Sequence, residues 1–271
     1  MNRPGGVAHL LRALPEMFRI GFADLVAYRA AMVIWILSAT MPLIMLALWN
    51  TVVSEAPLAG FGPTEITRYF AATLVVRQLT SAWLVWHMNW MIRTGALSPR
   101  LLRPVNPLIW EGVEMLAAMP LRLLVLAPMV VGLVLWRPEL LAWPGAAAMG
   151  LFVVSVSLAW LLGFLIQALF GCLAFWLDQS DGIFGTWFSA WMLFSGYVAP
   201  LAMFPEAMQG VLRWLPFRGM LAVPVELLAG MLSPADALLD IGIQLGWVGL
   251  FAMALVFVWR TGLRRYGAFG A

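Results

Sequence analysis

The 271-residue chain is 63% hydrophobic and only 11% charged, with a mean hydropathy of +0.92. Soluble domains are about 45–50% apolar and about 25% charged, so this composition excludes an ordinary soluble protein and indicates a polytopic membrane protein. The net charge of +3 does not argue for nucleic-acid binding, because arginines that face the cytoplasm and anionic lipid account for it. We expect a single membrane domain over residues 1–271, without a separate soluble domain.

All 16 basic residues are arginine. A Walker A loop needs a lysine on the nucleotide phosphates, so the chain cannot hydrolyse ATP by that route. Cys172 is the only cysteine and lies in an apolar stretch, while His9 and His87 are far apart. We therefore expect no intrachain disulfide, no metal site and no cofactor. Neither a His-Glu-x-x-His nor a Gly-x-Ser-x-Gly motif occurs, and we expect no enzymatic activity.

Residues 1–29 have the pattern of an amphipathic helix rather than of a signal peptide, because charged residues interrupt the segment. Apolar residues recur at steps of three and four, which predicts a helix that lies in the membrane interface and bends at Pro15. The apolar residues in question are Val7, Leu10, Leu11, Leu14, Phe18, Phe22 and Leu25.

The remaining apolar stretches predict an all-α membrane fold with six transmembrane helices, since about 20 apolar residues cross a bilayer core. The expected spans are residues 30–49, 68–91, 115–136, 145–177, 183–203 and 241–259. The fourth stretch approaches 50 Å as a helix, so it must tilt, break near Gly163 or Gly171, or project from the bilayer. The polar turn at 178–182 joins the fourth and fifth spans into a helical hairpin.

Residues 204–240 form a segment of moderate hydrophobicity that four prolines interrupt. Its apolar pieces are too short to span a membrane. They predict short re-entrant or interfacial helices before the last span, packed on protein where broken backbone can find partners.

The distribution of arginine predicts the orientation. With the N-terminus inside, the cytoplasmic segments hold ten arginines and the outer segments three, which fits the positive-inside rule. Both termini and the 92–114 segment are then cytoplasmic, and residues 204–240 are extracytoplasmic.

The expected second span has one polar face and one tryptophan face. Thr73, Thr80 and Ser81 lie within about 60° of Arg77 at 100° per residue, whereas Trp83, Trp86 and Trp90 fall opposite. A charge near the membrane centre usually faces the bundle interior or a wet cavity. Arg77 thus either lines a translocation path or meets an anionic substrate group, or it serves as a structural ion pair or carbonyl-capping residue between helices. Both interpretations remain open.

Other polar residues in the spans have structural or transport interpretations. Arg122 could line the path together with Ser81 and His87, or extend toward the cytoplasmic interface. His87 lies near the inner boundary, and the tryptophan face suits lipid contact better than substrate contact. Gln167 is expected to form ordinary interhelical hydrogen bonds.

The segment 95–107, GALSPRLLRPVNP, is basic, divided by proline and unsuited to lipid. It resembles a "G-x-L-x-x-x-L-L-R-P" signature of the permease subunits of bacterial type-2 ABC transporters. The segments YVAPLAMFP at 197–205 and LPF at 215–217 resemble the outer-leaflet part of the same proteins, as does the six-span layout with an N-terminal interfacial helix. The resemblance covers essentially the whole chain.

This resemblance implies a dimeric permease in the bacterial inner membrane, either a homodimer or a heterodimer, with each subunit docked on a cytoplasmic ATPase that binds ATP and Mg²⁺. It implies that the segment 92–114 contains the coupling contact with the ATPase, and that the interfacial helix adds a second contact. The coupling residues would be Ser98, Arg100, Leu101, Leu102, Arg103 and Pro104. It further implies export of a drug, antibiotic, lipid or glycan.

Two other functions fit these residues less well. A secondary transporter or channel would use Arg77 and His87, but the chain lacks inverted halves and has few membrane-embedded acids for ion coupling. A membrane scaffold without transport would have no use for a basic coupling segment.

Overall fold

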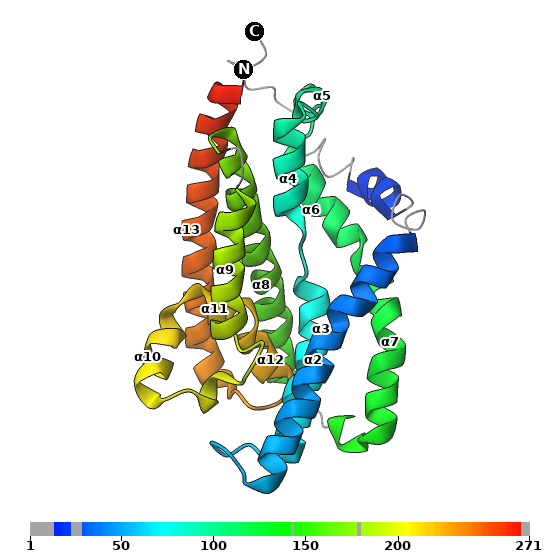
Figure 1. Ribbon diagram of the computed structural model, residues 1–271, viewed down its shortest axis with the longest axis vertical. Coiled ribbons are helices and arrows are strands. Elements are labelled where there is room, and N and C mark those ends of the chain that lie inside the picture. The colour runs from blue at the N-terminus through cyan, green and yellow to red at the C-terminus, as the bar shows by residue number, and fades with distance from the viewer. Residues whose placement is uncertain (1–13, 23–28, 142–143, 178–179, 267–271) are drawn as a thin grey trace.

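The computed structural model describes residues 14–22, 29–141, 144–177 and 180–266, and within these ranges it is helical and contains no β-strand (Figure 1). The all-α prediction is confirmed. The long helices are α2 (Arg29–Glu55), α3 (Pro63–Thr80), α4 (Leu84–Arg93), α6 (Pro107–Ala117), α7 (Met119–Trp136), α8 (Ala146–Cys172), α9 (Asp181–Phe194) and α13 (Pro234–Tyr266). The short ones are α5 (Leu97–Leu101), α10 (Glu206–Trp214), α11 (Pro216–Met220), α12 (Ala222–Leu228) and the 3-10 turns η1 (Pro138–Leu141), η2 (Leu173–Phe175) and η3 (Leu201–Met203).

Helix α8 is the centre of the bundle. It packs against α13, α4, α12, α11, α3 and α9, and its apolar residues leave no polar stripe that would have to face water. The helix is continuous through Gly163 and ends at Cys172, one residue after Gly171, where the 3-10 turn η2 follows. The long fourth stretch therefore does not break at Gly163.

Among the described residues, three helical stretches are long and apolar enough to cross a membrane: Pro107–Trp136, Ala146–Phe175 and Pro234–Tyr266. The first consists of α6 followed directly by α7, so it begins well before the expected start at residue 115. The last begins at Pro234 instead of residue 241. The count of six spans stays a prediction.

The expected second span is not one continuous helix. Helix α3 ends at Thr80 and α4 begins at Leu84, and the residues between them are not helical. No proline or glycine occurs at this point. The sequence therefore contained no local signal for the break.

Helix α9 is shorter than the expected fifth span. It has 14 residues and extends about 21 Å, less than the thickness of a bilayer core. The chain leaves it through Gly196, which has φ +91°, and Tyr69 Oη donates a 2.8 Å hydrogen bond to the Gly196 carbonyl. A Cβ at this glycine would overlap the Tyr69 hydroxyl, so the close contact requires glycine.

Residues 204–240 form the short helices that were predicted, α10 to α12, before α13 begins. Pro216 occupies the first turn of α11 and Pro205 precedes α10, which are positions where the missing amide hydrogen of proline is harmless. Their depth in a membrane stays a prediction.

Of the N-terminal segment, residues 14–22 are described and are helical. Met17 is buried and Phe18 is 40% exposed, while Gly21 lies against Ala117 and Glu114 of α6. Residues 1–13 and 23–28 of the predicted interfacial helix lie outside the described residues.

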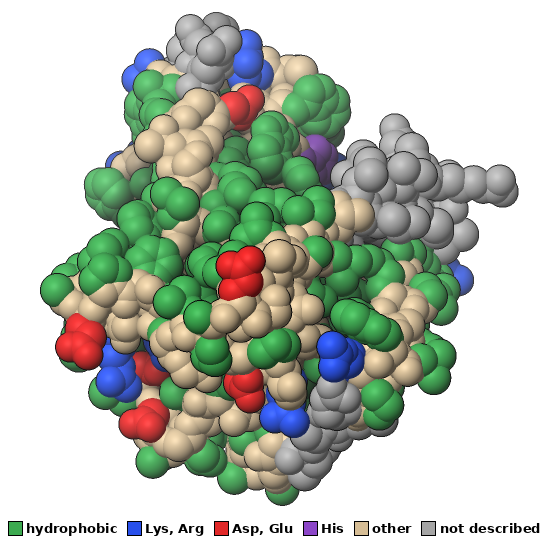
Figure 2. All heavy atoms as spheres, turned by 60° about the horizontal axis from the view of Figure 1, so that its bottom comes forward, with side chains coloured by type: hydrophobic (Ala, Val, Ile, Leu, Met, Phe, Trp, Pro, Cys, Tyr) green, Lys and Arg blue, Asp and Glu red, His purple; other side chains and the backbone are tan. Residues whose placement is uncertain are grey.

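The two ends of the bundle differ. One carries α5 and the C-terminal end of α13, and the other carries α10 to α12 (Figure 1). Figure 2 looks obliquely onto the second end and shows acidic and basic side chains among a mainly hydrophobic and uncharged surface.

Candidate functional site

Helix α5 forms an exposed tip at one end of the bundle. Gly95, with φ +79°, turns the chain away from α4, and Leu97 anchors the tip in the core with 0% exposure. By contrast, Leu101 is 36% and Leu102 is 88% exposed. Of the two leucines predicted to contact a partner, Leu102 presents almost its entire side chain.

A charged network lies directly beneath this tip. Glu111 of α6 has a side chain that is only 2% exposed, and one carboxylate oxygen lies 2.8 Å from His87 Nδ1 on α4. The other carboxylate oxygen accepts from the Arg100 guanidinium of α5. Arg100, predicted to contact a partner, is thus engaged within the chain. Glu111 was missed, since a lone glutamate near a helix start gives no sequence signal of this role.

Two further contacts fix the tip. Ser98 Oγ and Tyr266 Oη form a 2.9 Å hydrogen bond between α5 and the end of α13. The Arg103 guanidinium lies 5.4 Å from the Trp110 ring centroid, a cation–π distance. Pro104 is exposed. The predicted coupling residues therefore lie together on a surface that α4, α6 and α13 support.

Two polar side chains bond to the backbone at the break between α3 and α4. Gln167 of α8 accepts from the Leu84 amide at 2.8 Å and donates to the Ala82 carbonyl at 2.8 Å. Arg122 of α7 donates to the Ser81 carbonyl at 2.5 Å. Buried backbone groups outside a regular helix need such partners, so these residues make the break tolerable.

At this break the structure shows the contacts of Arg122 and Ser81, two of the residues predicted to line a translocation path. Arg122 does not extend to an interface, because it is 5% exposed and bonds to the break. Arg122 therefore caps a backbone carbonyl, a role that the sequence also allowed for Arg77. The Ser81 hydroxyl accepts from the Trp83 indole at 3.2 Å, within the same turn.

Arg77 lies among aromatic rings. Its guanidinium carbon is 5.1 Å from the Trp191 ring centroid and 5.9 Å from that of Tyr197. It lines a cavity of about 300 Å³ that Trp83 and Trp86 also line. The expected opposition of Arg77 and these tryptophans does not hold, because the break interrupts the regular turn of 100° per residue.

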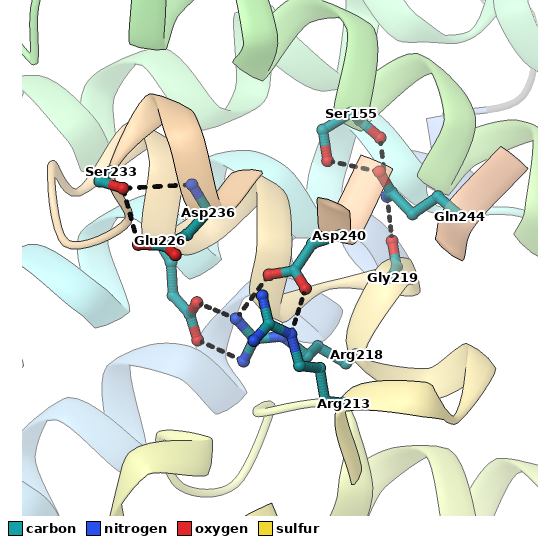
Figure 3. Close-up of polar contacts among 9 residues, drawn as sticks. All are labelled: Ser155, Arg213, Arg218, Gly219, Glu226, Ser233, Asp236, Asp240 and Gln244. Carbon is teal, nitrogen blue, oxygen red and sulfur yellow. Dashed lines mark hydrogen bonds and ion pairs between the residues drawn. The ribbon is translucent and has the colours of Figure 1, made fainter. Parts of the chain in front are cut away.

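A second charged network joins α10, α11, α12 and the start of α13, at the end of the bundle opposite α5. Arg213 of α10 donates to Asp240 at 2.9 Å, and Arg218 of α11 donates to Asp240 at 3.1 Å. Arg218 also forms a two-pronged pair with Glu226 of α12, at 2.7 and 3.2 Å. Figure 3 shows these side chains converging from α10, α11, α12 and α13. The network holds the short helices on the start of α13.

An amide network lies beside it. Gln244 of α13 accepts from Ser155 Oγ at 3.0 Å and donates to the Gly219 carbonyl at 2.6 Å (Figure 3). A Cβ at Gly219 would lie 2.8 Å from Gln244 Cγ, so this contact requires glycine. Gln244 thereby connects α13, α8 and α11.

Within the described part of the chain, no group of three or more His, Cys, Asp or Glu side chains could hold a metal ion. Comparison with curated proteins gives no match. A family model described as ABC-2 family transporter protein matches residues 24–270, which covers nearly the whole chain and confirms the family that the segment 95–107 indicated. This family supplies the membrane component of an ABC transporter and implies an ATPase partner. The chain belongs to the ABC-2 family of transporter proteins.

Proposed function

We propose that this chain is the permease subunit of an ATP-driven exporter that moves an amphipathic substrate out of the cytoplasm or the inner leaflet. It pairs with a second permease subunit and with a cytoplasmic ATPase that binds ATP and Mg²⁺. The location is the bacterial inner membrane, with both termini in the cytoplasm. The observation that carries the proposal is the α5 tip, which exposes Leu102 on a segment that the bundle holds rigidly.

The contacts of the tip give it the properties of a coupling element. An exposed leucine on an otherwise supported helix is the kind of apolar anchor that a protein partner buries. Leu97 belongs to the same hydrophobic core as Met88 of α4 and Trp259 of α13. A displacement of α5 would therefore be transmitted to both helices.

The route from the tip into the membrane follows α4. Glu111 ties Arg100 to His87 on this helix. The N-terminal end of α4 lies at the break that Gln167 and Arg122 stabilise. Hinges lie where a few residues between rigid elements absorb a backbone change. We place the hinge at residues 81–83, next to the cavity that Arg77 lines.

Charge supports the orientation. The α5 end carries the exposed arginines Arg93, Arg103, Arg260, Arg264 and Arg265. At the opposite end, Arg213 and Arg218 are neutralised by Asp240 and Glu226. An excess of arginine on one side marks the cytoplasmic face.

A secondary transporter that uses Arg77 and His87 has weaker support. His87 pairs with Glu111 below the α5 tip, whereas Arg77 packs on Trp191. The two residues therefore take part in separate arrangements, and family membership favours an ATP-driven system.

The test is co-purification with the cytoplasmic P-loop ATPase that this proposal requires. The double substitution Leu101→Asp and Leu102→Asp should abolish the pairing and leave membrane insertion intact, because it places two charges in an apolar contact. The matched control, Leu101→Met and Leu102→Met, keeps the apolar surface and should retain the complex. If the aspartate variant still binds the ATPase and exports, the coupling assignment is wrong.

A further inference from the structure

The cavity beside Arg77 is a lateral pocket in the membrane part of the molecule. It lies between the α3–α4 region and α9, with α8 behind it, and has a volume of about 300 Å³. Aromatic side chains make up much of its wall: Trp83, Trp86, Phe184, Trp187, Phe188 and Trp191. Trp83 and Trp86 are 41% and 45% exposed, so the pocket opens at the surface of the chain.

Backbone features create the space. The α3–α4 break brings Trp83 to the same pocket as Arg77, and the backbone partners of the break hold it there. Small residues form part of the opposite wall. A Cβ added at Gly185 would meet nothing within 4 Å, and one at Gly163 would meet its nearest atom at 3.9 Å. The pocket is therefore preformed, as ligand sites usually are.

Arg77 provides the positive charge of this pocket. None of the ion pairs between described residues includes it. Its contacts are the rings of Trp191 and Tyr197 and a hydrogen bond with the Tyr197 side chain. Aromatic faces and a phenol hydroxyl stabilise a cation only in part, and a guanidinium away from water still favours an anion. A ligand with an acidic group would supply that anion.

Asp181 determines which end of such a ligand would lie next to Arg77. It lines the same pocket and accepts a 2.8 Å hydrogen bond from Asn89. Asp181 precedes Trp191 by ten residues on α9, or about 15 Å along the helix. An acidic head would therefore be repelled near Asp181 and attracted near Arg77, and the apolar part would lie over Phe184 and Phe188.

We propose that this pocket binds an amphipathic anion, whose carboxylate or phosphate pairs with Arg77 and whose apolar body packs on the aromatic wall. The inference rests on the proposed transport function and gives it a substrate class. Both a free amphiphile and an anionic membrane lipid combine an acidic group with an apolar body, and the experiment distinguishes these two sources.

The experiment uses the purified permease alone in phosphatidylcholine nanodiscs. A fatty acid that carries a photoactivatable diazirine is compared with the fatty alcohol of the same chain length, and the labelled peptides are identified by mass spectrometry. The acid should label the α4 and α9 peptides about tenfold more than the alcohol, as one well-placed charge interaction would give. Equal labelling by the acid and the alcohol in the unsubstituted protein would overturn the proposal.

Variants test Arg77 directly. Arg77→Gln should lower acid labelling to the level of the alcohol, and Arg77→Lys should keep most of it. Arg93→Gln, which removes an exposed arginine outside the pocket, should change nothing. Unchanged labelling in a folded Arg77→Gln variant would also overturn the proposal, while the comparison in the unsubstituted protein does not depend on any variant folding.

A further arm identifies the source of the anion. Diazirine-labelled phosphatidic acid should label these peptides more strongly than the fatty acid if the occupant is a lipid, and less strongly if it is a free amphiphile. Either result supports an anion site. No ATPase is present, so a failure of this experiment leaves the coupling proposal to its own test.

Discussion

Single residues in this protein have roles that depend on which partner the fold brings to them. Glu111 is buried between His87 and Arg100, although nothing in the sequence marks it. Arg122 and Arg77 are both arginines in apolar stretches, yet one bonds to a broken backbone and the other faces aromatic rings. The residue type therefore fixes which interactions a side chain can make, and its neighbours in the fold decide which of them it makes.

Glu111→Gln should weaken the support of the α5 tip. The change removes a buried carboxylate that the Arg100 guanidinium and the His87 ring share. Both of these side chains keep some water contact, since they are 24% and 35% exposed. We expect the free energy of unfolding in mixed micelles to fall by about 1–3 kcal/mol. ATPase binding should also weaken.

The control is Glu16→Gln. Glu16 pairs with Arg19 at 3.0 Å, but both side chains are largely exposed, and exposed pairs contribute about 0–1 kcal/mol. The stability of this variant should be nearly unchanged. A Glu111→Gln protein as stable as the control would contradict the supporting role.

At the scale of elements, the break between α3 and α4 is the main feature that the hydrophobic pattern does not show. Residues 81–83 are Ser, Ala and Trp, and neither proline nor glycine occurs among them. The break exists because α7 and α8 supply hydrogen-bond partners at this level. Without these partners a continuous helix would satisfy the same backbone groups by itself.

Gln167→Leu should destabilise this break. It leaves the Leu84 amide and the Ala82 carbonyl without the partner they have now, and unsatisfied buried groups cost about 1–3 kcal/mol. The free energy of unfolding should fall by that amount, measured in mixed micelles. Amide hydrogen exchange at residues 81–84 should become faster.

Ser157→Ala on the same helix is the matched control. The Ser157 hydroxyl is exposed and bonds only to the Val153 carbonyl of its own helix, so its loss should have little effect. Equal stability of the two variants would show that Gln167 does not sustain the break.

For the whole molecule, the two ends have different chemistry. Helix α5 and the end of α13 are joined through Ser98 and Tyr266, and exposed arginines surround them. The other end has a network in which Asp240 and Glu226 neutralise Arg213 and Arg218. This asymmetry predicts which end faces the cytoplasm.

Cysteine labelling tests the orientation. The sole cysteine, Cys172, is buried, so Cys172→Ala gives a background for single cysteines at exposed Thr94 and Ala207. A membrane-impermeant maleimide should label Thr94→Cys only in inside-out vesicles and Ala207→Cys only from the periplasmic side. The reverse pattern would refute the orientation.

The sequence by itself determined the membrane class, the helical fold, the exposed tip around Leu102 and the family. These follow from composition, from apolar periodicity and from one local motif, all of which are short-range properties. Only the tertiary structure decided the break at residues 81–83, the partner of Arg100 and the pocket that joins Arg77 to Trp83 and Trp86. Each of these depends on contacts between helices far apart in the chain, which periodicity along a single helix cannot specify.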